Sequence, residues 1–220
     1  MKKRFRFLLF LLALLSLFAS CSRTASFSID QGGYRDGKTG VIYTHAPDNY
    51  RSTDDFVPEA LVGTYRNPKS GKIISFYRVE GMDGVLTDEN SELYLSPDAS
   101  LPDFSDFSLA FAKLYLSGTT IYPICSFDAD DAEQFRNAVL SGTSLDYGLI
   151  RPSLLRDSQY ELVFFERELP LAYCLIYLEL SEDLVISTDA GEVNYGSQFL
   201  YDRSIKTCYP IEKLTSERAS

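Results

Sequence analysis

The sequence contains no tryptophan and only one histidine among its 220 residues. The single histidine, His45, excludes zinc sites built on several histidines and the HExxH motif of metalloproteases. A serine or cysteine nucleophile with a histidine base would have to use His45, and no nucleophile-elbow motif accompanies it. Sugar-binding surfaces often rely on tryptophan, so its absence counts against that function. No catalytic, metal-binding or cofactor-binding residue is predicted.

The N-terminal apolar run, residues 7–18, is shorter than the roughly 20 residues that a membrane-spanning helix needs. Four basic residues precede it, namely Lys2, Lys3, Arg4 and Arg6. A basic head followed by a short apolar run is typical of a cleaved secretory signal. The alternative is a short N-terminal membrane anchor that stays uncut, and the residues that follow the run favour cleavage.

Two small residues, Ala19 and Ser20, stand directly before Cys21 in the stretch LFASC. This arrangement resembles the lipobox of bacterial lipoproteins, although Phe18 stands where that family prefers leucine or another aliphatic residue. The resemblance covers residues 1–22. It implies that signal peptide 1–20 is removed and that Cys21, as a diacylglyceryl cysteine, carries fatty acyl chains such as palmitate.

The same resemblance implies that the protein is located in the cell envelope. The protein would be anchored on an extracytoplasmic face, either of the cell membrane or of the outer membrane. Ser22, rather than aspartate, follows Cys21. In a diderm cell this permits transfer to the outer membrane, whereas in a monoderm cell the protein would remain on the outer face of its only membrane.

Basic residues are scarce once the signal is removed. The full chain has 21 Lys and Arg against 31 Asp and Glu. Loss of the four basic residues before the apolar run leaves 17, for a net charge of −14. Such a surface repels phosphate backbones, which excludes nucleic acid as a partner, and it disfavours docking on anionic lipid. Membrane contact is therefore expected through the acyl chains alone.

The domain organisation follows from composition. Residues 21–40 are rich in Ser and Gly and predict a lipidated cysteine followed by a flexible tether. Residues 41–214 predict a β-rich globular domain, with a boundary near 97–106 if it forms two lobes. Three cysteines remain there, Cys125, Cys174 and Cys208, which permit at most one disulfide, so the fold must be held by its core.

Hydrophobic patterns predict an α+β fold, mostly antiparallel β-sheet with one or two short helices. Strands are expected in the segments 40–45, 60–66, 72–79, 91–96, 112–117, 120–127, 160–166, 171–180, 183–188, 197–202 and 206–211. Residues 67–71 predict a hairpin turn, and residues 128–142 predict a helix capped by Asp128. The strand at 171–180 is expected to be central, because Ala172, Cys174, Ile176, Leu178 and Leu180 form one apolar face. Cys174 is expected to be a buried, unreactive thiol.

Two motifs partly match known ligand-binding sequences, one for phosphate and one for calcium, but neither has the features that such a site needs. GGYRDGKT, residues 32–39, has the spacing of a phosphate-binding loop, but a β-branched segment and Pro47 follow it where a helix should begin. A turn is expected instead, with Gly37 at positive φ and Lys38 in solvent. DADDAE, residues 128–133, lacks the alternating oxygen donors of a calcium loop, and helix capping explains its carboxylates.

The function predicted from the sequence is a lipid-anchored extracytoplasmic binding or interaction protein. Its expected partners are the membrane, through Cys21, and an extracytoplasmic protein or ligand of unknown identity, with no nucleotide, nucleic acid or cofactor. Two alternatives stay open: a cell-envelope hydrolase that uses paired carboxylates, and a structural envelope component.

Overall fold

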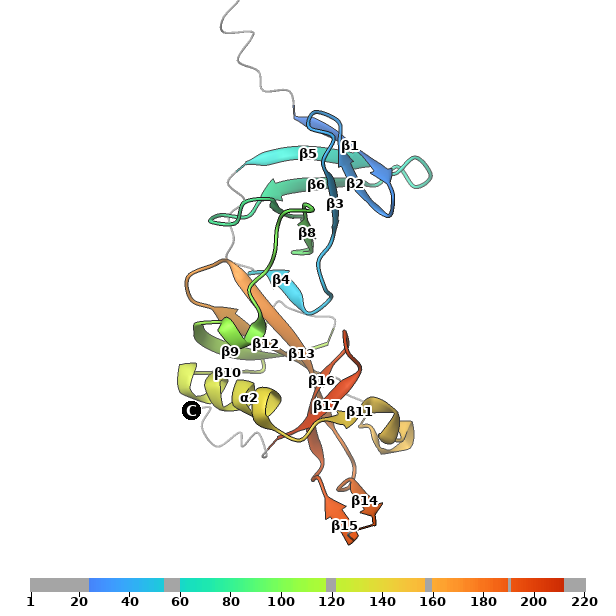
Figure 1. The fold of residues 1–220 in the computed structure, drawn as a ribbon, viewed down its shortest axis with the longest axis vertical. Coiled ribbons are helices and arrows are strands. Elements are labelled where there is room, and N and C mark those ends of the chain that lie inside the picture. Colours follow the sequence, from blue (N-terminus) through green and yellow to red (C-terminus); the bar gives the residue numbers. More distant parts are fainter. Residues whose placement is uncertain (1–23, 54–59, 118–121, 157–159, 190, 212–220) are drawn as a thin grey trace, which may run out of the picture.

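The computed structural model describes residues 24–53, 60–117, 122–156, 160–189 and 191–211. Their strands form a seven-stranded closed barrel, an eight-stranded sheet and a two-stranded hairpin. Figure 1 shows these parts in that order along the long axis of the molecule. The prediction of a β-rich fold is confirmed, whereas the barrel was not predicted.

The barrel is closed by strands from the first half of the chain, in the order β1-β2-β3-β8-β7-β6-β5. Their bounds are β1 (Ala25–Asp30), β2 (Gly33–Asp36), β3 (Ile42–His45), β5 (Leu61–Arg66), β6 (Ile73–Arg78), β7 (Val85–Thr87) and β8 (Leu93–Leu95). The β1–β5 pair, which closes the barrel, is parallel, and the other described strand pairs are antiparallel. Aromatic rings fill the interior, with Phe76 lying 4.6 Å from Phe27 and 5.2 Å from Tyr94 between ring centroids.

The expectation of a flexible tether over residues 21–40 is wrong from Ala25 onward, because β1 and β2 are barrel strands. Ala25 and Phe27 are buried inside the barrel. Two glycines of this region, Gly33 and Gly37, stand where another strand packs too closely for a side chain. A Cβ on Gly33 would lie 2.5 Å from the carbonyl oxygen of Tyr43, so a larger residue cannot stand there.

The sheet is built mainly from the second half of the chain, in the order β10-β9-β12-β13-β16-β17-β11, with β4 also pairing with β13. Its bounds are β4 (Tyr50–Ser52), β9 (Leu109–Leu116), β10 (Cys125–Phe127), β11 (Leu145–Asp146), β12 (Tyr160–Glu166), β13 (Leu171–Glu179), β16 (Gln198–Asp202) and β17 (Thr207–Pro210). The predicted central position of β13 agrees with this order. The β12 and β13 sequences are almost continuously apolar because both faces of these strands carry buried residues.

The two faces of β13 belong to different clusters, which the sequence did not reveal. The predicted face is divided: Ala172 is buried in one small cluster, and Ile176, Leu178 and Leu180 are buried in another. Cys174 packs against the first cluster but is only half-buried, so the prediction of a buried thiol is wrong in this respect. The largest core lies on the opposite face, where Leu171, Tyr173, Leu175 and Tyr177 pack. Val79, Val85 and Leu93, at the end of the barrel, join this core, so barrel and sheet share one apolar interior.

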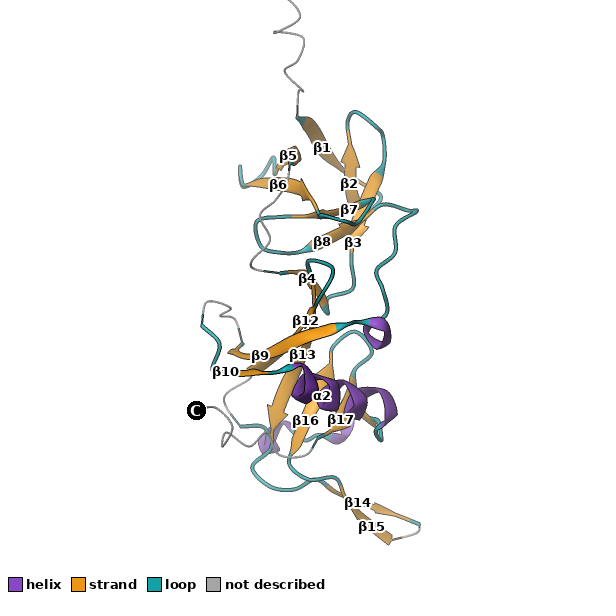
Figure 2. Ribbon diagram, turned by 90° about the vertical axis from the view of Figure 1, so that its left-hand side faces the viewer, coloured by secondary structure: helices purple, strands orange, loops and turns teal. Residues whose placement is uncertain are grey.

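One α-helix is described, α2 (Ala129–Ser141), and it covers the core face of the sheet. Figures 1 and 2 both place it beside the sheet and below the barrel. Asp128 caps it as predicted, since its carboxylate accepts a hydrogen bond from the Asp131 amide at 3.0 Å. Three 3₁₀ turns complete the helical structure: η1 (Phe104–Asp106), η2 (Tyr147–Leu149) and η3 (Pro152–Leu154). No helix in the described ranges has the length and apolar character needed to cross a membrane.

The hairpin of β14 (Val185–Thr188) and β15 (Gly191–Asn194) projects from the end of the molecule opposite the barrel, as Figures 1 and 2 show. The two strands pair only with each other among the described residues. Val185 and Val193 are exposed there, which is expected of a ribbon with no second layer.

A buried polar network fixes the chain just before β4. Asn49 Nδ2 donates to the Tyr173 hydroxyl at 2.9 Å, and this hydroxyl donates to Asp202 Oδ2 at 2.9 Å. Burial alone would raise the pKa of Asp202, but hydrogen bonds from Ser204, Asn49 and Tyr173 outweigh burial and lower it. The network therefore ties the residue before β4 to β13 and to the turn after β16.

Replacement of Leu175 by alanine tests the position of the main core. Leu175 is 1 % exposed on the β13 face opposite to the predicted one. We expect Leu175→Ala to lower the free energy of unfolding by about 2–5 kcal/mol, because a cavity remains in the core. Ile176→Ala should lower the free energy of unfolding by a similar amount, because Ile176 is buried on the other face.

Ile73→Ala, at an exposed barrel position, is the control and should lower the free energy of unfolding by less than about 1 kcal/mol in urea denaturation. An unchanged midpoint for Leu175→Ala would place the core elsewhere.

Candidate functional site

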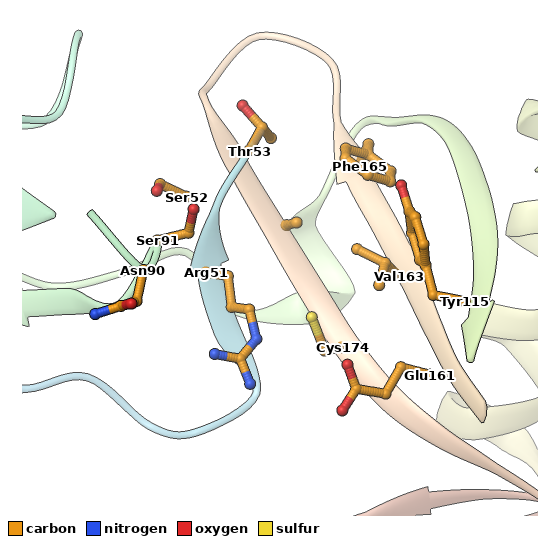
Figure 3. A pocket seen from close by; sticks show the side chains of 11 residues that line it. Arg51, Ser52, Thr53, Asn90, Ser91, Tyr115, Glu161, Val163, Phe165 and Cys174 are labelled. Atoms are coloured by element: carbon orange, nitrogen blue, oxygen red, sulfur yellow. The ribbon is translucent and has the colours of Figure 1, made fainter. Parts of the chain in front are cut away.

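A cavity of about 250 Å³ opens on the face of the sheet opposite to α2, next to the barrel. Strands β9, β12 and β13 form its floor, β4 forms one wall, and the turn between β7 and β8 contributes the rim. Figure 3 shows the side chains of the three sources, with the Asn90 side chain pointing away from Arg51. The cavity thus lies where residues from both halves of the chain meet.

Strand register places the floor residues on one face. Ala172 pairs with Phe165 of β12 on one side and with Arg51 of β4 on the other. Two residues further along β13, Cys174 pairs with Val163 of β12. Directly paired residues of neighbouring strands project to the same side of a sheet, so all five side chains face the cavity.

The floor is apolar and aromatic. Tyr115, Val163, Phe165 and Ala172 are buried and form one cluster. Phe165 stacks on Phe111 with ring centroids 4.5 Å apart. Lys113, on the same face of β9, places its ammonium 5.0 Å from the Phe111 centroid and 5.2 Å from that of Phe165. A cation therefore covers part of this aromatic surface.

The rim is held by a buried carboxylate. Asp88 accepts hydrogen bonds from the amides of Asn90 and Glu92, at 2.8 and 3.1 Å, and from the Tyr94 hydroxyl at 3.1 Å. These contacts allow Ser91 a left-handed backbone with φ of 63°. The turn thereby presents Asn90 and Ser91 at a fixed position beside β4.

The charged residues of the cavity are Arg51 and Glu161. Figure 3 shows the Arg51 side chain extending from β4 towards Cys174 and Glu161. The Glu161 side chain is only 14 % exposed and lies 3.6 Å from the Arg203 guanidinium. Glu92, on the barrel side, lies 3.6 Å from His45 Nδ1. Neither Arg51 nor Glu161 was singled out from the sequence.

Cys174 lies at the centre of the cavity as a free thiol. Burial raises its pKa to about 12, and the neighbouring Arg51 guanidinium opposes this shift without overcoming it. The thiol is therefore protonated at neutral pH and is a poor nucleophile. Cys125 and Cys208 are also free, and no disulfide joins them.

The other sequence motifs lie away from this cavity. GGYRDGKT forms β2 and a turn that leads into β3, a strand, as expected. Lys38 is exposed, but the glycine at positive φ is Gly40 rather than Gly37. The Asp36 carboxylate accepts from the Lys38 amide at 2.7 Å and so fixes the turn. His45 does not line the cavity; it lines a neighbouring depression with Glu92 and Arg203, and Arg51 borders both. Cys21 lies outside the described residues.

Comparisons of the chain with protein-family models, with curated proteins and with solved structures found no match. In the described part of the chain, no group of three or more His, Cys, Asp or Glu side chains is placed to hold a metal ion. The assignment of a function consequently rests on the cavity and on the N-terminal sequence.

The pH dependence of Cys174 alkylation tests the state of this thiol. Because its pKa is raised to about 12, the thiolate fraction should rise about tenfold per pH unit between roughly pH 7 and 9. We expect the rate of iodoacetamide labelling, followed by peptide mass spectrometry, to rise in proportion without levelling off. In urea-unfolded protein the same cysteine should level off near pH 9, since an unperturbed thiol has a pKa of about 8.5. A plateau near pH 8.5 in the folded protein would show that the thiol is not shielded.

Proposed function

We propose that this protein is a lipid-anchored extracytoplasmic binding protein and that the cavity beside β4 is its binding site. The observation that carries the binding assignment is the composition of the cavity: an apolar floor with a few polar groups converging on it. Ligand-binding sites have this composition, because apolar surface supplies affinity and placed polar groups fix orientation.

The anchor is proposed from residues 1–22, whose basic head, apolar run and LFASC stretch resemble a lipoprotein signal. Strand β1 begins at Ala25, only four residues after Cys21. At about 3.3–3.6 Å per extended residue, roughly 14 Å is the longest possible connection. An acylated Cys21 would therefore hold the barrel close to the bilayer. Figure 1 places the start of β1 at one end of the long axis and the sheet beyond the barrel, so the barrel would stand between the lipid and the sheet.

Binding is favoured over hydrolysis by the chemistry of the cavity. Glu161 is the only carboxylate among its described lining residues, and Arg203 lies beside it. Glycoside cleavage by paired carboxylates needs a second carboxyl group at about 5–9.5 Å, on the other side of the scissile bond. The protonated Cys174 thiol does not supply a nucleophile either.

Replacement of Cys21 tests the proposed anchor. In a bacterium with a lipoprotein pathway, the wild-type chain should incorporate labelled fatty acid and sediment with membranes. Cys21→Ala should abolish labelling and leave a precursor that is larger by the signal segment, because lipidation precedes cleavage. Cys125→Ala is the control: this half-buried cysteine lies in the sheet, and its replacement should leave labelling intact. Wild-type protein that takes up no fatty acid and is released into the medium would contradict the anchor.

A further inference from the structure

We propose that the cavity beside β4 binds a small organic carboxylate, whose charged group meets Arg51 and whose apolar body lies on Val163, Phe165 and Ala172. This names the ligand class of the binding function proposed above, and it rests on that function.

The charge of the ligand follows from the partners of the surrounding residues. Arg51 is partly buried and lines the cavity, yet no described carboxylate lies within 4.0 Å of it. Two acidic side chains in its surroundings have other partners, since Glu161 lies beside Arg203 and Glu92 lies beside His45. A third, Asp48, is exposed to solvent and lines neighbouring depressions together with Arg51. A guanidinium that is partly removed from water is stabilised by a carboxylate, which it can hold with two parallel hydrogen bonds.

The number of charges is limited by Glu161. Its carboxylate lines the same cavity and would repel a second negative charge on the ligand. Phosphates and dicarboxylates would therefore be disfavoured. The chain as a whole carries a net charge of −10, so an anion is attracted by the local guanidinium and not by the general field of the protein. Both points favour a monoanion.

The apolar part of the ligand follows from the floor. Val163, Phe165 and Ala172 are 6 %, 7 % and 2 % exposed, and they present a flat surface between the strands. Phe165 is stacked on Phe111, and the Lys113 ammonium covers part of this pair, so a ring of the ligand would lie on the part of Phe165 that lines the cavity. The cavity of about 250 Å³ holds the equivalent of roughly eight waters, which suits a single ring or a short chain rather than a polymer.

The rim supplies the remaining polar contacts. Asn90 and Ser91 stand across from Arg51 on a turn whose shape is fixed by Asp88. The Asn90 amide donates to Asp88, so the Ser91 hydroxyl is the rim group that can add a hydrogen bond to a carboxylate held by the guanidinium. The site is thus assembled before a ligand arrives, which reduces the cost of ordering on binding.

Three probes of the same shape and different charge test the proposal by isothermal titration calorimetry on the detergent-solubilised full-length protein. They are 3-phenylpropionate, 3-phenylpropanamide and 3-phenylpropylamine. We expect the carboxylate to bind at least about tenfold more tightly than the amide, in line with a charge-assisted hydrogen bond, and the amine to bind most weakly. Equal affinities for carboxylate and amide, or a preference for the amine, would overturn the assignment.

Variants of Arg51 separate its charge from its size. Arg51→Gln should weaken 3-phenylpropionate binding by about tenfold or more. Arg51→Lys should keep the preference for carboxylate over amide at reduced affinity, because the charge remains without the planar fork. Arg156→Gln is the matched control, since this guanidinium pairs with Glu179 away from the cavity, and it should leave the affinity for 3-phenylpropionate unchanged.

Thermal melting checks that each variant is folded. An unchanged affinity in a folded Arg51→Gln protein would overturn the proposal, and if that variant does not fold, Arg51→Lys and the wild-type probe series decide.

The place of binding is tested through Cys174, which lines the cavity. Saturating 3-phenylpropionate should slow alkylation of Cys174 at least about threefold, as expected when most sites are occupied, and should leave Cys125 unaffected. Binding without protection of Cys174 would put the ligand elsewhere and overturn the site. If none of the three probes binds, the carboxylate assignment falls, while the lipid anchor, which is measured by acylation of Cys21, is unaffected.

Discussion

Strand β4 is hydrogen-bonded to both parts of the molecule, and the arrangement of barrel and sheet depends on it. On the sheet side its residues pair with Leu171–Tyr173 of β13, and the Cys174 amide donates to the Asn49 carbonyl at 2.7 Å. On the barrel side the Ser52 amide donates to the Ser91 carbonyl at 3.0 Å, and the Ser52 hydroxyl lies 2.8 Å from that of Thr87. A strand of three residues would have little stability alone, so both neighbours are required.

The cavity is a consequence of this double attachment. A sheet with α2 on one face leaves its second face to be covered by something else, and here β4 and the β7–β8 turn cover only part of it. The uncovered part keeps an apolar floor next to a guanidinium without a described counter-ion. Displacement of β4 would take Arg51 out of the cavity and would also break the hydrogen bond that holds the β7–β8 turn beside β4. The shape of the cavity and the docking of the barrel therefore depend on the same few hydrogen bonds.

The local features of the fold could be predicted from the sequence, and the long-range ones could not. The turn at residues 67–71 predicts the β5–β6 hairpin, and Asp128 predicts the start of α2, because each signal lies beside the element that it specifies. Barrel closure joins β1 to β5 and β3 to β8. These strands are distant in sequence, and no turn or motif beside them indicates which strand each will pair with. Strand β4 is too short for a periodic pattern. Glu161, the one charged residue that shares a face with Val163 and Phe165 in its strand, was the available sign of a site on that face.

Hydrogen exchange at β4 tests this dependence most directly. The amides of Ser52, Thr53 and Cys174 donate to Ser91, Pro170 and Asn49, so all three are bonded across the junction. If β4 joins barrel and sheet into one cooperative unit, these amides should exchange only through global unfolding, at rates matching those of the β12–β13 ladder. Exchange of the Ser52 and Thr53 amides within seconds, while the amides paired between β12 and β13 stay protected, would show that the junction opens on its own and that β4 does not hold the two parts together.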